Sequence, residues 1–149
     1  MKFLFCLLFF SVVSVGDPAW LTDFTQAKAE ASRSNKMILL NFSGSDWCIP
    51  CIRLHKELFA SEAFRNYASA HLVLVSADFP RLKKNQLSKE QTKQNEALAE
   101  QYNPRGTFPL TVLLDARGKV VKQWEGFPKL SPEGFVAEVS GASLVVAKQ

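Results

Sequence analysis

Residues 37–51 read Met-Ile-Leu-Leu-Asn-Phe-Ser-Gly-Ser-Asp-Trp-Cys-Ile-Pro-Cys, which places two cysteines three residues apart behind an apolar run. The run at 37–42 predicts a buried strand, and the small polar residues at 43–46 are typical of a turn. A helix is expected from Cys48 to about Leu58. Pro50 would lie in its first turn, where a missing N–H costs nothing.

A cysteine at the start of a helix is well placed for thiol chemistry. The helix N-terminus presents unpaired N–H groups and the positive end of the dipole, and both favour a thiolate. The thiolate is the nucleophile, and such positions lower a cysteine pKa to roughly 3.5–7.5. We therefore predict that Cys48 attacks a substrate disulfide and that Cys51, one turn further on, resolves the mixed disulfide.

The remaining sequence alternates between helix-like and strand-like segments on either side of this motif. Ser61, Ser88 and Ser131 have the residue type and spacing of helix N-caps, and Ser88 with Gln91 has capping-box spacing. The order predicts an α/β fold with helices on both faces of a central sheet of four to five strands. The expected helices are 20–34, 62–70, 88–102 and one from 131 onward, and the expected strands are 72–77, 110–114 and 119–124.

The cysteine count favours exchange chemistry over a structural role. The chain has three cysteines, and only Cys48 and Cys51 lie outside the N-terminal apolar run. A pair this close closes too small a loop to constrain the unfolded chain much. The alternative is a zinc site that adds His55 and His71, but structural zinc sites usually draw their ligands as two close pairs. We therefore expect no metal, and we interpret His55 as a partly exposed histidine or a modulator of the thiols.

Composition and charge argue against nucleic-acid binding. The hydrophobic content of 47% and the net charge of +4 are those of an ordinary globular protein with a mild basic excess. The basic residues are scattered apart from a small group at Arg81, Lys83 and Lys84, whereas a nucleic-acid binder usually carries a denser stripe. We interpret this group as a solvated loop.

The first residues have the pattern of a secretory signal peptide. Lys2 precedes an almost wholly apolar run from Phe3 to Val15, and small residues at 14–16 suit cleavage between Gly16 and Asp17. A membrane span needs about 20 apolar residues, and the polar residues from Asp17 onward cut this run short. We therefore expect residues 1–16 to be removed, leaving one domain over 17–149 without stable membrane insertion.

Two motifs together resemble the thioredoxin superfamily. Trp47-Cys48-Ile49-Pro50-Cys51 follows a strand, and Arg105-Gly106-Thr107-Phe108-Pro109 precedes one, where thioredoxins carry a cis-proline facing the cysteines. The resemblance covers nearly all of 17–149. It implies the thioredoxin fold with a mixed sheet, a redox-active disulfide between the two cysteines, and a substrate-binding surface formed by Trp47, Phe108 and Pro109. Trp47 is expected as a surface lid. The aromatic side chains expected in the core are those of Trp20, Phe24, Phe42 and Trp124.

The sequence departs from this family at two buried positions. Thioredoxins carry an aspartate on the strand before the cysteines, with a lysine beside it, and Asn41 and Leu74 occupy the matching places. Neither residue can exchange a proton near neutral pH. Proton transfer at Cys51 must then use water, a carboxylate such as Glu57 or Asp46, or His55, and the sequence does not choose among them.

The leading hypothesis is an exported, periplasmic enzyme that reduces disulfides in other exported proteins. A proline before the second cysteine resembles thioredoxin and the reducing periplasmic members of the superfamily, which makes isomerase or oxidase activity the alternative. Such a reductase requires an electron donor, for which a membrane protein is expected; no cofactor is expected, and the protein should be a monomer. The second hypothesis is a non-catalytic module that binds a client or a metal-delivery partner.

Overall fold

The computed structural model describes residues 16–148, so the predicted signal peptide lies almost wholly outside the described residues. The chain forms one five-stranded mixed sheet in the order β1-β3-β2-β4-β5. Along the chain the elements are β1 (Trp20–Leu21), α1 (Phe24–Ser34), β2 (Met37–Ser43), α2 (Ile49–Arg53), the π-helix η1 (Leu54–Phe59), α3 (Glu62–His71), β3 (Leu72–Asp78), the 3₁₀ turn η2 (Lys83–Asn85), α4 (Lys89–Tyr102), β4 (Leu110–Leu114), β5 (Val120–Glu125) and α5 (Pro132–Ala147).

The sheet is parallel on one side and antiparallel on the other. β2 and β3 pair in parallel, with Leu40 opposite Val75, and β1 adds in parallel to the outer edge of β3. β4 and β5 are antiparallel to β2 and to each other. Because β2 is central, the loop that leaves its C-terminal end starts from a rigid position, and that loop leads to Cys48.

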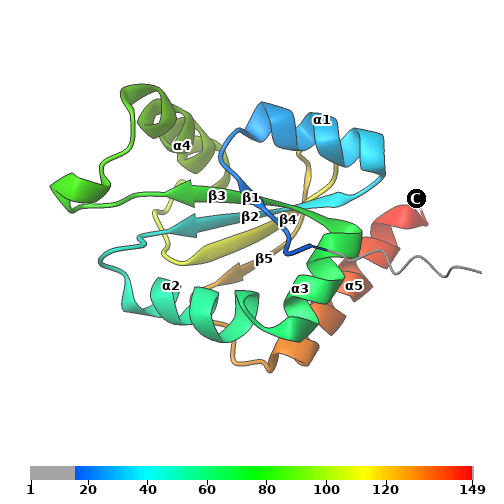
Figure 1. Cartoon of the computed structure of the whole chain (residues 1–149). Coiled ribbons are helices and arrows are strands. Elements are labelled where there is room, and N and C mark those ends of the chain that lie inside the picture. The colour runs from blue at the N-terminus through cyan, green and yellow to red at the C-terminus, as the bar shows by residue number, and fades with distance from the viewer. Residues whose placement is uncertain (1–15, 149) are drawn as a thin grey trace, which may run out of the picture.

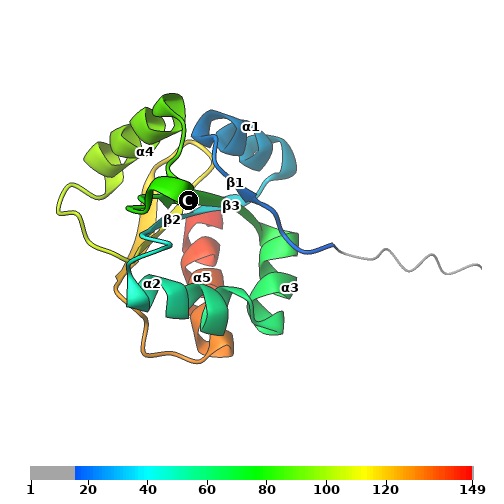
Figure 2. The ribbon, with the colours of Figure 1, turned by 60° about the vertical axis from the view of Figure 1, so that its left-hand side comes forward.

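Helices cover both faces of the sheet, as the sequence predicted. Figure 1 shows α1 and α4 on one face and α2, α3 and α5 on the other, and the turned view in Figure 2 shows the same two layers. Each layer has its own apolar core. One contains Ala27, Ala31, Leu98 and Tyr102 against the sheet, and the other contains Leu54, Leu58, Phe64, Ala68, Phe135 and Val139.

Serine caps begin three of the helices, as expected. Ser61, Ser88 and Ser131 each accept a hydrogen bond from a backbone N–H three residues on. The capping box at Ser88 is only half formed. The Gln91 side chain does not return to Ser88 but donates to the Thr22 carbonyl and to Asn95.

The first predicted helix begins later than expected. Trp20 and Leu21 form β1 and pair with Leu74 and Val75, so the prediction of helix from Trp20 is wrong for these residues. The helix starts at Phe24 because the Asp23 carboxylate accepts the N–H of Gln26 at 3.0 Å.

Two further element predictions need small corrections. The helix that begins after Cys48 changes to a π-helix at Leu54 and ends at Phe59, and the last strand is displaced by one residue, to Val120–Glu125. The π-helix closes with a hydrogen bond from the Ala60 N–H to the His55 carbonyl at 2.9 Å.

The aromatic residues expected in the core divide into two groups. Phe42 and Trp124 are buried. Trp20 and Phe24 are half-buried and pack against the edges of the two cores. Within residues 16–148, no helix is both long and apolar enough to cross a bilayer.

Candidate active site

Cys48 and Cys51 form a disulfide at the start of α2. Cys48 is the N-cap, and its sulfur accepts the N–H of Cys51 at 3.3 Å. Pro50 lies in the first turn, as the sequence predicted. Cys48 keeps 5% of its surface exposed and Cys51 none, so an incoming molecule meets Cys48 first. Ile49, between them, is 66% exposed.

Trp47 directly precedes Cys48 in the chain and is half-buried. Its indole N–H donates to the Phe79 carbonyl at 2.8 Å, and its ring meets Phe108 edge-on at 5.6 Å. The Arg81 guanidinium lies 3.7 Å from the centre of the same ring. A side chain at Gly44 would overlap this indole, so glycine is required there for the ring to reach its place.

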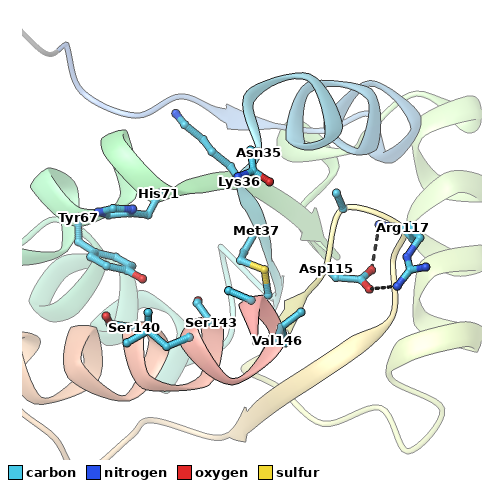
Figure 3. Close-up of a pocket in the computed structure, with 13 residues that line it drawn as sticks. Asn35, Lys36, Met37, Tyr67, His71, Asp115, Arg117, Ser140, Ser143 and Val146 are labelled. Carbon is cyan, nitrogen blue, oxygen red and sulfur yellow. Dashed lines mark hydrogen bonds and ion pairs between the residues drawn. The ribbon is translucent and has the colours of Figure 1, made fainter. Parts of the chain in front are cut away.

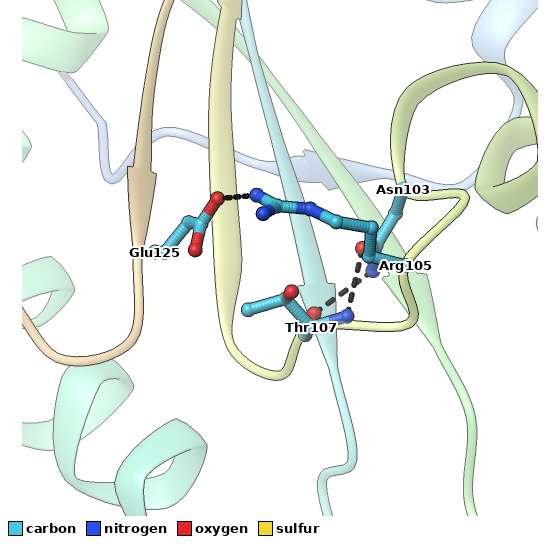
Figure 4. Close-up of polar contacts among 4 residues, drawn as sticks. All are labelled: Asn103, Arg105, Thr107 and Glu125. Carbon is cyan, nitrogen blue, oxygen red and sulfur yellow. Dashed lines mark hydrogen bonds and ion pairs between the residues drawn. The ribbon is translucent and has the colours of Figure 1, made fainter.

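The turn before β4 brings Phe108 against Trp47, with Pro109 next in the chain. The Phe108–Pro109 peptide is cis, as the resemblance to thioredoxins implied. Asn103 holds the turn through two hydrogen bonds of 2.8 Å to the backbone of Thr107. Figure 4 shows these bonds together with the ion pair that joins Arg105 to Glu125 on β5.

The loop after β3 belongs to the site, although its sequence resembled a simple solvated connection. Asp46 accepts the backbone N–H groups of Arg81 and Leu82 at 2.9 and 3.0 Å and the Asn85 amide at 3.0 Å. These donors, with the Arg81 N–H first, hold the pKa of Asp46 below its ordinary value. Phe79 packs on Phe108 with ring centres 5.4 Å apart.

Polar residues lie behind the disulfide. Asn41 is fully buried in β2 and lies 3.2 Å from the His55 ring nitrogen Nε2. His55 is partly exposed, as expected, but its contact with Asn41 was not predicted. Burial lowers the pKa of His55 from its ordinary value, and the nearby Asp78 carboxylate opposes part of that shift.

A cavity of about 440 Å³ opens on this inner side of the disulfide. It lies between α2 with η1 and the C-terminal ends of β2 and β3. Its wall is formed by Ser43, Ser45, Cys51, Ile52, His55, Lys56, Ser76 and Asp78.

The four residues of the alternative zinc site do not come together. His71 stacks on Tyr67 with ring centres 4.6 Å apart. It lines a separate cavity of about 480 Å³ with Met37, where β2 begins, at the opposite end of the strand from Cys48. Figure 3 shows this cavity, with Asp115 and Arg117 paired at its rim. Over residues 16–148, no three histidine, cysteine or acidic side chains gather as metal ligands would.

Comparison with known proteins identifies the family. The model of the thioredoxin-like domain matches residues 24–140. The chain belongs to the thioredoxin-like family. It is 35% identical over 119 residues to the disulfide bond reductase DsbH of Chlamydia pneumoniae, covering 80% of this chain and 69% of that protein.

Solved structures agree with this assignment. The structure of a DsbH oxidoreductase is similar with a TM-score of 0.78 and 32% identity, over 87% of both chains. A thioredoxin from Thermus thermophilus has the same fold, with a TM-score of 0.62 and 17% identity over 85% of this chain and 87% of its own. This thioredoxin-like protein is thus a homologue of a disulfide bond reductase and carries a disulfide with the Cys-x-x-Cys spacing.

The structure therefore brings all five predicted site residues of the thioredoxin-like protein into one region. Trp47 contacts Phe108, and Pro109 follows Phe108 at the start of β4. Sequence reasoning missed Phe79 and Arg81, because nothing in a polar loop indicated that Asp46 would hold it against Trp47. The contact of His55 with Asn41 was also missed. The four-residue spacing indicated only that His55 lies on the same helix face as Cys51.

Proposed function

We propose that this protein is an exported thiol–disulfide oxidoreductase that reduces disulfides in other exported proteins. The observation that carries the proposal is the Cys48–Cys51 disulfide at a helix N-terminus, with only Cys48 keeping exposed surface. Homology to a disulfide bond reductase supports the same conclusion.

The reaction uses the two cysteines in sequence. In the reduced protein, the Cys48 thiolate attacks one sulfur of a client disulfide, and the other client sulfur leaves as a thiolate that takes up a proton. The Cys51 thiolate then attacks the Cys48 sulfur, which re-forms the Cys48–Cys51 disulfide and releases the second client thiol. The helix start and the Cys51 N–H, 3.3 Å from the Cys48 sulfur, favour the thiolate needed for the first step.

The client binds beside Cys48, on the surface formed by Trp47, Phe108 and Pro109. Aromatic rings provide a large apolar contact for an extended peptide. Proline has no N–H to donate, so in this proposal the main chain of Phe108 pairs with the client backbone. Arg81, stacked on Trp47, adds a positive charge at the edge of the surface.

The residues around Cys48 favour reduction as the net direction. A very stable thiolate stabilises the reduced form and makes the protein oxidising. Ile49 carries no polar side chain, and Pro50 provides neither a side-chain donor nor a backbone N–H, so the thiolate has few stabilising partners. The reduction potential is therefore expected nearer to about −270 mV, as in thioredoxin, than to about −120 mV, as in the strong periplasmic oxidant.

Export and an electron donor complete the proposal. The pattern at residues 1–16 supports a signal peptide with cleavage after Gly16, which would place the mature domain in the periplasm. Reduction there consumes electrons, so a membrane protein must re-reduce the Cys48–Cys51 disulfide. Sequencing of the N-terminus of the exported protein should begin at Asp17 or within two residues of it.

Equilibration with glutathione, followed by alkylation and mass measurement, tests the direction. A potential more oxidising than about −180 mV, the level of protein disulfide isomerase, would replace reductase with isomerase or oxidase. The protein should also accelerate the precipitation of insulin by dithiothreitol. A potential in the reductase range without any acceleration, and without mixed disulfides, would instead favour a client-binding module.

A further inference from the structure

Resolution of the mixed disulfide requires that Cys51 lose its proton, and the structure lacks the usual buried acid for this step. Asn41 and Leu74 occupy the positions where thioredoxins place an aspartate and a lysine, and both are buried. An amide and an alkyl group cannot accept a proton near neutral pH. Water, a carboxylate or His55 must do so instead.

Neither Glu57 nor Asp46, the two carboxylates that the sequence offered for this role, is positioned for it. Glu57 forms a two-point ion pair with Arg53, at 2.9 and 3.2 Å, on the exposed side of the helix. Both oxygens of Asp46 accept hydrogen bonds from the loop after β3. Neither of these two carboxylates is part of the cavity wall to which Cys51 contributes. Asp78 is part of it, but both of its oxygens accept hydrogen bonds from Ser45.

His55 is part of that wall, and its distance from Cys51 along the chain is one helical turn. The cavity holds about 440 Å³ and is bordered by hydroxyl groups and the Asp78 carboxylate. A cavity of that size has room for water, and the serine hydroxyls, the His55 ring and the Asp78 carboxylate in its wall provide hydrogen-bond partners. Water can therefore connect the Cys51 thiol to the His55 ring once the mixed disulfide has freed Cys51 from Cys48.

The hydrogen bonds of Asn41 determine which ring nitrogen of His55 is basic. The Asn41 amide nitrogen lies 3.4 Å from the Leu110 carbonyl, which can only accept, and 3.1 Å from the Thr111 hydroxyl. The Asn41 oxygen therefore faces His55, and Nε2 of His55 donates its hydrogen to that oxygen at 3.2 Å. In the neutral ring the lone pair is then on Nδ1, so Nδ1 is the atom that accepts a proton.

The surroundings keep His55 neutral and ready to accept. Its ring packs against Trp20 and Phe59, with ring centres 5.3 and 5.0 Å away. This burial lowers the pKa of His55, while Asp78 on β3 opposes part of the effect. Lys56, on the same helix, also borders this cavity. His55 also lines a second cavity of about 280 Å³, which the Arg65–Asp17 ion pair borders.

We propose that His55 is the proton acceptor for Cys51, through water in this cavity, when Cys51 resolves the mixed disulfide; this role rests on the proposed function. The Cys51 thiol gives its proton to His55 Nδ1, and the resulting thiolate attacks the Cys48 sulfur. The Cys48–Cys51 bond forms as the bond from Cys48 to the client sulfur breaks. The client leaves as a thiolate and takes up the proton that His55 received. The client disulfide is thereby reduced and the cysteine pair oxidised.

Rapid mixing of the reduced protein with a disulfide-containing peptide tests the proposal, because formation and decay of the mixed disulfide are measured separately. His55→Gln keeps an N–H donor for Asn41 but has no basic nitrogen. It should slow the decay by about 100-fold or more and leave the formation rate unchanged. His71→Gln is the matched control, since it makes the same chemical change at the exposed histidine beside Tyr67.

The pH profile distinguishes proton transfer from a structural role. In the wild-type protein the decay rate should level off once His55 is neutral, whereas in His55→Gln it should keep rising with pH until the Cys51 thiol itself ionises. NMR titration of the wild-type protein provides a test without a variant. The His55 midpoint should differ between the oxidised and the reduced protein.

Two results would overturn the proposal in distinguishable ways. A wild-type protein that never forms mixed disulfides with peptides would end both the proposed function and the role of His55. Mixed disulfides that decay at the same rate and with the same pH profile in wild-type and His55→Gln, with one His55 midpoint in both redox states, would overturn the role of His55 alone.

Discussion

The two sides of the Cys48–Cys51 disulfide differ in chemistry. On the outer side, Trp47 contacts Phe108 and Arg81 through ring faces and edges, so the surface is aromatic with a cationic rim. On the inner side, a cavity is bordered by hydroxyls, His55 and Asp78. The outer side is suited to holding a peptide, and the inner side is suited to moving a proton.

This difference suggests a division of the reaction between the two cysteines. Of the two cysteines, Cys48 keeps the exposed surface, and it directly follows the aromatic residue Trp47 in the chain. Cys51 has no exposed surface and belongs to the cavity wall. Variants on the outer side should therefore change client binding, and variants on the inner side should change resolution.

The largest effect is expected from the cysteines themselves. Cys48→Ser should abolish exchange, because the attacking thiol is lost. Cys51→Ser should accumulate mixed disulfides with clients, since attack survives and resolution does not. Non-reducing gel electrophoresis with mass spectrometry of trapped complexes measures both. Faster alkylation of Cys51 than of Cys48 by iodoacetamide in the reduced wild-type protein would reverse the assignment.

Asn41→Leu should be the next largest perturbation and act only on the inner side. It keeps the approximate volume but removes the amide that joins His55 to the Thr111 hydroxyl. Leaving buried polar groups unpaired costs about 1–3 kcal/mol, which urea unfolding would measure. Resolution should slow because His55 loses its positioning partner, while the rate of mixed-disulfide formation stays the same. A slower formation rate would contradict the division between the two sides.

Trp47→Ala should act on the outer side alone and by less. The variant removes the ring that contacts the client in the proposed function, and an aromatic contact contributes about 0.5–1.5 kcal/mol beyond its area. The KM for a peptide client should rise by about two- to twelvefold on that basis, with the decay of mixed disulfides unchanged. A slower decay at an unchanged KM would show that Trp47 serves the resolving step instead.

The smallest predicted effect is on the pH dependence of stability. Burial lowers the pKa of His55 below its ordinary value of 6.5, so below about pH 6.5 the unfolded chain binds more protons than the folded protein. The free energy of unfolding should therefore fall as the pH drops from 6.5 towards the pKa of His55 in the folded protein. Above pH 6.5, His55 should cause no further change in this free energy.

Urea unfolding of the oxidised protein at about pH 7.5 and about pH 5.5 measures this dependence. In His55→Gln, the part of the change in unfolding free energy that His55 causes between these two pH values should be lost. His71→Gln should keep that part. An identical pH dependence in wild-type and His55→Gln would show that His55 is protonated equally in the folded and unfolded chains.

Local sequence signals predicted most of the elements, because their causes lie within a few residues. Serine oxygens at Ser61, Ser88 and Ser131 reach N–H groups three residues away, so spacing alone identifies these helix starts. The failure at Trp20 has a different cause. Its strand partner, Leu74, lies 54 residues further along the chain, and the short segment pairs only with the edge of β3.

For the candidate site, the sequence by itself identified the cysteine pair that forms the disulfide, since Cys48 and Cys51 lie within one helical turn after a predicted strand. It also showed that Asn41 could not serve as the acid of related proteins. Tertiary structure alone decided what surrounds the pair. His55 meets Asn41 because α2 and η1 pack on the sheet beside β2, and the loop after β3 lies on Trp47 because Asp46 holds its backbone. Such contacts join side chains from separate elements, whose distances depend on how helices and strands pack.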